Sequence, residues 1–198
     1  MLLFTDDHLF WYVARAAGLG AYLVLFIDVI LGLMVRTKVG DRLVARWQSF
    51  DLHQFTSFVA IGLLALHVVA LLGDHYIGYT VPQVLIPFTS PYRPVETAFG
   101  VIGMYLIVVT TASFWLKRFI GQRGWRTLHY ATFSAFFLSL LHGLTAGTDN
   151  NQGWVWAMYW ATGWAVTVLT IWRFAMHRPS TLNRAASVQQ GVEGVRAH

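Results

Sequence analysis

The chain has 198 residues, of which 56% are hydrophobic, 16% are aromatic and only 12% are charged, and it contains no cysteine. A soluble globular domain carries about 25% charged residues, so this composition argues against a soluble enzyme, a disordered chain and a nucleic-acid-binding domain. The absence of cysteine excludes disulfides, thiolate catalysis, iron–sulfur ligation and covalent c-type heme attachment. We therefore expect one integral membrane domain.

Five stretches are long and apolar enough to cross a hydrocarbon core of about 30 Å, which takes about 20 residues of helix. The predicted spans cover about 11–35, 50–72, 98–116, 128–145 and 154–174. The first is not expected to be a cleaved signal peptide, because Asp6 and Asp7 stand where such a peptide needs basic residues. The expected fold class is an all-α integral membrane protein, a bundle of five transmembrane helices.

The lysines and arginines orient this bundle. Of the 14, all but Arg15 and Arg93 lie after the first span, after the third span or at the C-terminal end. By the positive-inside rule the N-terminus is then outside and the C-terminus is cytoplasmic, which requires an odd number of spans. The basic pI of about 9.8 is therefore a sign of topology and not of a nucleic-acid partner. We expect a multi-pass protein of the plasma membrane, in contact with lipid.

Two segments lie outside the predicted spans. The longest outer loop, 73–97, contains four of the five prolines and the apolar run VPQVLIPF, which predicts a segment lying on the membrane surface or covering a site on the outer face. Residues 179–198 are polar and unpatterned, as is typical of a disordered cytosolic tail. The expected organisation is a membrane domain over 1–178 followed by that tail.

Four histidines lie inside two spans, His53 and His67 in the second and His129 and His142 in the fourth. At 1.5 Å per residue their separations are about 21 Å and about 19.5 Å. The two spans run in the same direction, so His53 and His129 share an inner depth and His67 and His142 share an outer one. Ionisable groups inside a bilayer are rare and mark functional sites. Two facing imidazoles at each level are the arrangement that axial ligation of two stacked hemes requires.

One feature of the fourth span complicates this arrangement. On an ideal helix 14 residues rotate a side chain by about −40°, but 13 residues rotate it by about −140°. Either that helix is distorted, or the two hemes meet it from different sides. Several glycines could let a porphyrin approach the backbone or could simply pack helices closely; they are Gly62, Gly100, Gly103, Gly143 and Gly163.

Two segments carry the histidine pairs: DLHQFTSFVAIGLLALHVV in the second span and GWRTLHYATFSAFFLSLLHGLTAG leading through the fourth. In both His spacings and in Trp-Arg-x-Leu-His, the sequence resembles the ferric-reductase-like transmembrane family, which includes the membrane domains of NADPH oxidases and ferric reductases. The resemblance covers roughly residues 10–175. It implies that His53 and His129 hold an inner heme b, and that His67 and His142 hold an outer one. Family members often have six spans, and the first has no counterpart here.

The resemblance also implies a function. Fused reductases of this family continue into flavin- and nicotinamide-binding domains, whereas this sequence ends at residue 198, so we expect a stand-alone heme subunit of a transmembrane oxidoreductase. It would be a membrane cytochrome b that moves electrons through two hemes b, with flavin contributed only by a partner protein. The external acceptor could be a ferric chelate, oxygen, a quinone or a partner flavoprotein, and the sequence leaves the direction of electron flow open.

Fixed charges near the two levels are candidate partners for the anionic heme propionates. On the inner side these are Arg123 and Arg126, which could equally serve only to anchor the topology. On the outer side they are Arg15 and Arg93. Asp28, in the middle of the first span, is expected to be protonated, to pair with a polar group of another span or to relay a proton.

Two other classes of protein compete with this interpretation. A polytopic transporter could use the intramembrane histidines to carry a metal ion or protons, and a structural membrane protein would leave the histidine pattern unexplained. Zinc prefers a tetrahedral cluster of close ligands, and the second and fourth spans contain no proline that would mark the broken helices of many transporters. Both observations favour heme.

Overall fold

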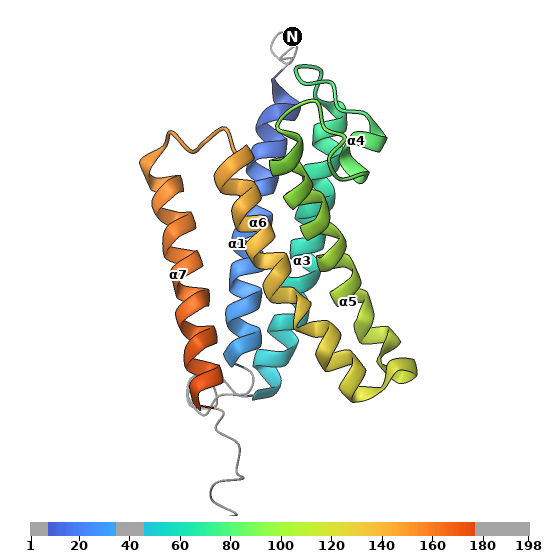
Figure 1. The fold of residues 1–198 in the computed structure, drawn as a ribbon, viewed down its shortest axis with the longest axis vertical. Helices are drawn as coiled ribbons and strands as arrows, with labels where there is room; N and C mark the ends of the chain where they lie inside the picture. The colour runs from blue at the N-terminus through green and yellow to red at the C-terminus, as the bar shows by residue number, and fades with distance from the viewer. Residues whose placement is uncertain (1–7, 35–45, 177–198) are drawn as a thin grey trace, which may run out of the picture. The chain divides into compact units, whose positions relative to one another are not determined.

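The computed structural model describes residues 8–34 and 46–176, and all regular structure in these ranges is helical. The helices are α1 (Leu9–Met34), α3 (Arg46–Gly73), α4 (Val81–Leu85), α5 (Pro94–His129), α6 (Ala131–Ala146) and α7 (Gly153–Met176) (Figure 1). The chain divides into two compact units, Met1–Val166 and Thr167–His198. The second unit includes the end of α7, and the candidate site described below lies in the first.

Three described stretches are long and apolar enough to cross a membrane, namely Leu9–Met34, Gln48–Gly73 and Pro94–Ala146. A chain in lipid must satisfy its backbone groups internally, which a helix does. The all-helical class is therefore confirmed for the described residues, and the three apolar stretches support a membrane protein. The predicted first and second spans are α1 and α3, and the predicted third and fourth fall within the single stretch Pro94–Ala146.

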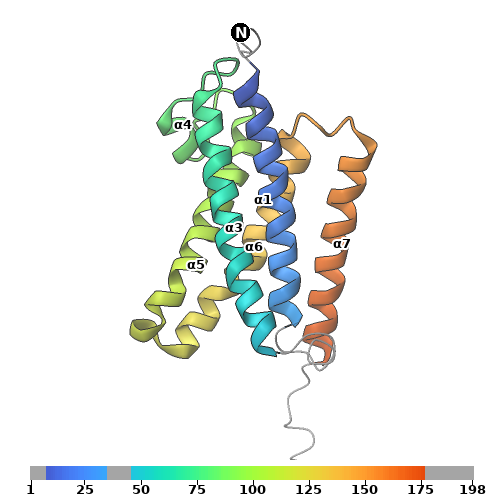
Figure 2. The ribbon, with the colours of Figure 1, turned by 180° about the vertical axis from the view of Figure 1, so that it is seen from behind.

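The stretch Pro94–Ala146 doubles back on itself, as Figure 2 shows. Its first helix, α5, begins with Pro94 at a position where the missing N–H costs nothing. Helical dihedral angles are interrupted at Gly121, with φ 70° and ψ 169°. Glycine adopts a positive φ without steric cost, and the chain reverses there. Helix α6 then packs along α5; that the two helices cross the membrane separately stays a prediction.

The predicted fifth span, α7, is not among the three apolar stretches. Its 24 residues are long enough. Five of them are tryptophan, however, and the indole N–H makes this side chain amphipathic, suited to a membrane–water interface. The tryptophans of α7 are all exposed; they are Trp154, Trp156, Trp160, Trp164 and Trp172. The number of long helices fits the prediction, but a membrane crossing by α7 stays a prediction.

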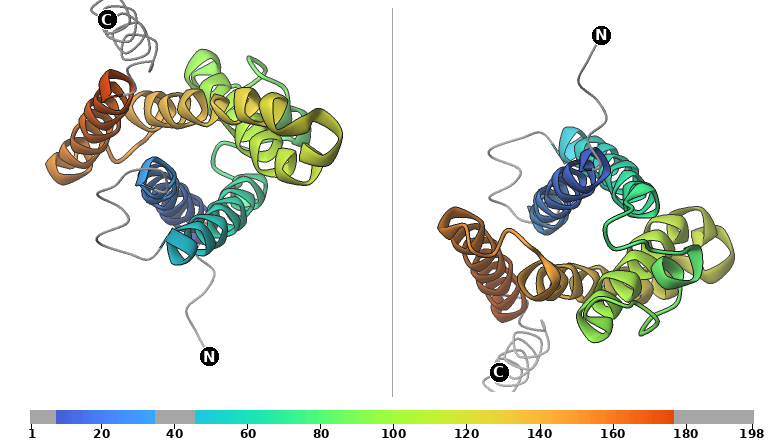
Figure 3. Two further views of the ribbon diagram at one scale, coloured as in Figure 1. Left: turned by 90° about the horizontal axis from the view of Figure 1, so that it is seen from below. Right: turned by 90° about the horizontal axis from the view of Figure 1, so that it is seen from above.

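The core of the first unit lies between two helix pairs. Seen end-on, α1 and α3 form one pair and face the pair made by α5 and α6 (Figure 3). Phe136 of α6 is fully buried and stacks on Tyr22 of α1 with ring centroids 5.7 Å apart, while Tyr159 of α7 meets the edge of Tyr22 at 4.8 Å. The Tyr22 hydroxyl also shares a hydrogen bond of 2.5 Å with Thr162. This central aromatic cluster (Tyr22, Phe136 and Tyr159) ties α1 to α6 and α7.

Candidate functional site

The four predicted histidines form two pairs across the first unit. His53 and His129, the lower pair, have ring centroids 6.1 Å apart and planes at 89°. His67 and His142, the upper pair, have centroids 6.4 Å apart and planes at 73°. The names follow α3, which runs upward in Figure 1 from Arg46 to Gly73. The residues predicted to share a level are therefore brought opposite each other at both levels, with their ring planes steeply inclined.

The spacing within each pair fits a metal ion held between two imidazoles. Two nitrogen–metal bonds of about 2 Å, with about 1 Å from each nitrogen to its ring centre, place the centroids about 6 Å apart. Within 8–34 and 46–176, no group of three or more His, Cys, Asp or Glu is placed to hold a metal ion. A heme iron receives four nitrogens from its macrocycle and needs only two axial ligands from the protein. The residues present therefore fit heme better than a tetrahedral zinc ion.

Backbone carbonyls of a neighbouring helix orient three of the four rings. The Nδ1 atoms of these rings lie 2.6 Å from the oxygen of Ala14 for His67, 2.9 Å from that of Glu96 for His142, and 3.0 Å from that of Asp28 for His53. Because a carbonyl only accepts hydrogen bonds, Nδ1 carries the proton in each ring, and Nε2 is left able to bind a metal. Hydrogen bonds of this kind are typical of metal-ligating histidines.

A glycine follows each of these carbonyls by four residues and leaves room for the ring. A Cβ added at these positions would lie 2.9 Å from His67 for Gly18, 2.9 Å from His142 for Gly100, and 3.3 Å from His53 for Gly32. Residues i and i+4 share one face of a helix, so carbonyl and glycine act on the same ring. We call each such combination a histidine seat; the seats are Ala14/Gly18, Asp28/Gly32 and Glu96/Gly100.

Two of the seats lie on α1, and their spacing matches that of the histidines they hold. Gly18 and Gly32 are 14 residues apart, as are His67 and His53 on α3. Helix α1 runs antiparallel to α3 and packs along it. One register of α1 on α3 therefore positions both rings. Sequence reasoning missed Gly18 and Gly32, although the matching spacings were available as a signal.

Asp28 adds a carboxylate to the lower pair. Its side chain is buried in α1, and Oδ1 lies 2.9 Å from Nδ1 of His53. Thr56 donates to Oδ1 at 2.5 Å, and Ser57 donates to Oδ2 at 2.9 Å. Of the three hypotheses for Asp28, pairing with polar groups of another span is therefore what the structure shows, and all three partners belong to α3.

His129 is held differently from the other three. It ends α5, and its ring stacks on Trp125 with centroids 5.0 Å apart and planes at 23°. Within the described residues, its buried Nδ1 has no hydrogen-bond partner. The helix breaks at Tyr130, whose carbonyl accepts from Phe133 at 3.2 Å in an i to i+3 bond, the tighter winding of a 3₁₀ turn. A distorted helix, one of the two predicted alternatives, thus accompanies the 13-residue spacing.

A cavity of about 220 Å³ lies at the upper pair. His67 and His142 line it together with Gly18 and Gly100, and most of its wall is apolar. The predicted outer loop 73–97, which contains the short helix α4, covers part of this cavity; its lining residues are Ile77, Tyr79, Val84, Tyr92 and Thr97. The loop also presents exposed apolar side chains, namely Val81, Ile86 and Phe88. The loop thus covers part of the cavity, as one of the two alternatives predicts; that it lies on the membrane surface stays a prediction.

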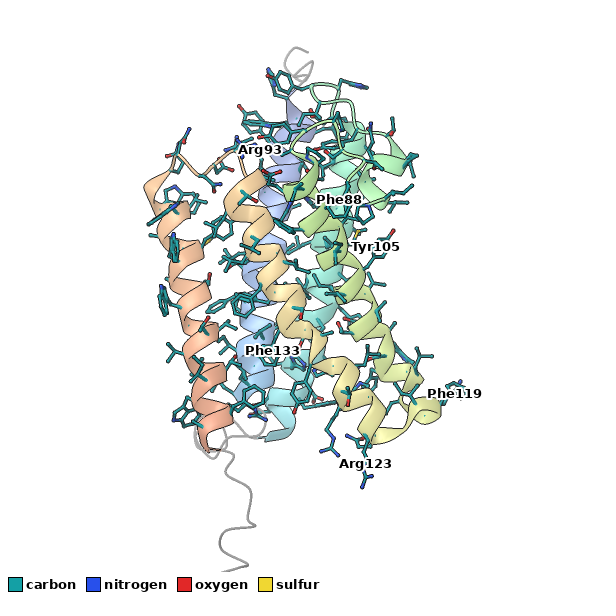
Figure 4. The ribbon with its side chains drawn as sticks, in the orientation of Figure 1. Phe88, Arg93, Tyr105, Phe119, Arg123 and Phe133 are labelled. Atoms are coloured by element: carbon teal, nitrogen blue, oxygen red, sulfur yellow. The ribbon has the colours of Figure 1, made fainter. Side chains whose placement is uncertain are left out.

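Two of the four candidate arginines, Arg93 and Arg123, lie at opposite ends of the first unit (Figure 4). Arg15 lines the upper cavity, forms an ion pair with Asp149 and lies 3.9 Å over the ring of Trp11. Arg93, with a left-handed φ of 42°, donates to the carbonyl of Thr145. The other two, Arg123 and Arg126, are exposed at the far end. Of the four, Arg15 borders the cavity that the upper histidines share.

Of the other glycines named from the sequence, Gly103, Gly143 and Gly163 face Ser139, Tyr159 and Leu140 and serve helix packing. A side chain on Gly62 would meet nothing within 4 Å. The predicted tail 179–198 and most of the basic segment after the first span lie outside the described residues.

No protein-family model, no curated protein and no solved structure matches the chain. The resemblance to the ferric-reductase-like family therefore stays a prediction from its motifs.

Proposed function

We propose that this chain is a membrane cytochrome b that carries electrons across a membrane through two hemes b, one at each histidine pair. The observation that carries the proposal is that the imidazoles lie opposite each other in pairs at two levels, with centroids 6.1 Å and 6.4 Å apart. Packing alone gives no reason for four intramembrane histidines to meet in pairs at the spacing that one metal ion between two rings demands.

Each part of the site has a task in this function. His53 and His129 would hold one iron, and His67 and His142 the other. The seats on α1 and α5 fix three of the rings with Nε2 available, and the mostly apolar wall around the upper pair suits an apolar macrocycle. Heme, when bound, would supply one-electron chemistry at both levels. Arg15 is the proposed partner of a propionate at the upper level.

The distribution of basic residues predicts how the helices are oriented across the membrane. We propose five transmembrane helices, α7 included, with the N-terminus outside and the C-terminus in the cytoplasm. The upper pair then faces the outside and the lower pair faces the cytoplasm, where Arg123 and Arg126 lie close to the membrane surface. A separate flavoprotein or a quinone would exchange electrons with one end, and an external acceptor such as a ferric chelate, oxygen or a quinone with the other.

Histidine substitutions test this function. Purified His67→Ala and His53→Ala should each lose one of two hemes b, counted as the pyridine hemochrome, because each removes one axial ligand from a different level. His75→Ala is the matched control, since His75 is exposed in the loop after α3, and it should retain both hemes. A His67→Ala variant with two hemes per chain would overturn the assignment of the upper pair, and a colourless wild-type protein would favour a transporter.

A further inference from the structure

The two seats on α1 differ in one respect that bears on charge. The residue that supplies the carbonyl is Ala14 at the upper seat and Asp28 at the lower seat. The upper ring on α3 therefore has a neutral carbonyl as the partner of Nδ1, whereas the lower ring has both a carbonyl and a carboxylate within 3.0 Å. Helix α1 thus places a carboxyl side chain beside the lower ring and none beside the upper ring.

The charge of Asp28 has no cationic partner among the described residues. Its neighbours are the hydroxyls of Thr56 and Ser57 and the ring of His53. All three lie within hydrogen-bond distance of the carboxyl group, with the Nδ1 atom of His53 at 2.9 Å. At the upper level, by contrast, Arg15 and Asp149 form an ion pair that is neutral as a whole. The lower level therefore has a buried carboxyl group beside its histidine with no lysine or arginine paired to it among the described residues.

We propose that Asp28 is a positioning residue that lowers the reduction potential of the heme at the lower pair below that of the heme at the upper pair. The inference rests on the proposed function. A carboxylate that accepts from Nδ1–H makes the imidazole a stronger donor to its metal, which favours ferric over ferrous iron. The negative charge acts in the same sense, because Coulomb interactions are strong at low dielectric constant.

This difference in reduction potential favours electron transfer from the lower level to the upper level. When one electron is shared between the two levels, the level with the higher potential holds it, which is the upper one. Under the proposed topology, the upper level faces the outside. Asp28 thus favours outward transfer from a cytosolic donor, a direction that the positions of the histidines leave open.

The test is a potentiometric titration of the purified protein carrying both hemes. Asp28→Asn keeps the shape of the side chain and removes its charge. We expect one of the two reduction steps to move upward, with a roughly tenfold change in the ratio of reduced to oxidised heme at a fixed ambient potential, equal to about 59 mV for one electron. The other step should stay in place. In a His67→Ala background, which keeps only the lower heme, the same shift should persist.

Ser57→Ala provides a second, independent test with the opposite sign. It removes one hydroxyl donor from the Asp28 carboxylate, which then accepts more strongly from His53, so the same step should move downward. A purely structural role would move the step in the same direction in both variants. Two bound hemes with neither variant shifting a step would overturn the inference and leave the proposed function standing. A wild-type protein without heme would instead overturn the proposed function. Should Asp28→Asn fail to bind the lower heme, the direction of the Ser57→Ala shift decides.

Discussion

Replacing Gly18 by alanine should weaken heme binding at the upper pair and leave the lower pair intact. The added Cβ would lie 2.9 Å from Nδ1 of His67, and ordinary contacts begin at 3.4 Å, so the ring must retreat by about 0.5 Å. That ring is held by a hydrogen bond of 2.6 Å to Ala14, and losing such a bond costs about 0.5–1.5 kcal/mol. Loss of an outer partner of a metal ligand typically lowers metal affinity by about 10–100-fold.

The assay is the rate and extent of heme transfer from the purified variant to an excess of apomyoglobin, followed by a hemochrome count. Gly62→Ala is the matched control, because Gly62 lies between the two histidines of α3 and a Cβ there would meet nothing within 4 Å. Alanine is favoured over glycine in a helix by up to about 1 kcal/mol, so neither variant should lose its fold. Gly32→Ala, with a contact of 3.3 Å to His53, should have a smaller effect, confined to the lower heme.

The reasoning would be refuted by a Gly18→Ala protein that retains two hemes and releases them as slowly as the Gly62→Ala control. It would be refuted equally by a Gly18→Ala protein that loses the lower heme first. Either result would mean that the seat on α1 does not fix the ring of His67.

Three further predictions concern other contacts of the first unit. Tyr22→Phe removes a buried hydrogen bond and should lower the free energy of unfolding by about 0.5–1.5 kcal/mol, measured by thermal unfolding in detergent, with both hemes retained; an unchanged midpoint would contradict it. Arg15→Gln and Asp149→Asn, combined in a double-mutant cycle, should show a coupling of up to about 1 kcal/mol because the pair is partly exposed, and strict additivity would speak against the pair. Gly100→Ala should weaken only the upper heme, as Gly18→Ala does, and an intact hemochrome count with slow release would argue against the third seat.

The histidine pairs could be predicted from the sequence because two simple rules place them. Hydropathy finds the helices, and helices two apart in an alternating bundle run in the same direction, so spacings of 14 and 13 residues bring His53 opposite His129 and His67 opposite His142. The sequence could not decide between a distorted fourth span and hemes on different sides of it, because neither glycine nor proline marks the helix break at Tyr130. That break depends on how α5 and α6 pack, which no local pattern records.

The seats were missed for a different reason. A glycine in a membrane helix is usually read as a site of close helix packing, and only the register of α1 on α3 shows that Gly18 and Gly32 face imidazoles. The same register decides that Asp28 meets His53, Thr56 and Ser57. Sequence periodicity gives the face of a helix that is apolar, but it does not fix how far one helix is shifted along its neighbour.

The central claim, that each histidine pair holds a heme, is tested most directly by the absorption spectrum of the detergent-purified protein, oxidised and then reduced with dithionite. We predict sharp reduced α and Soret bands and a hemochrome count of two hemes b per chain, one for each pair at 6.1 Å and 6.4 Å. A protein expressed with ample heme that is colourless after purification would contradict the claim. A count of one would restrict the claim to a single pair.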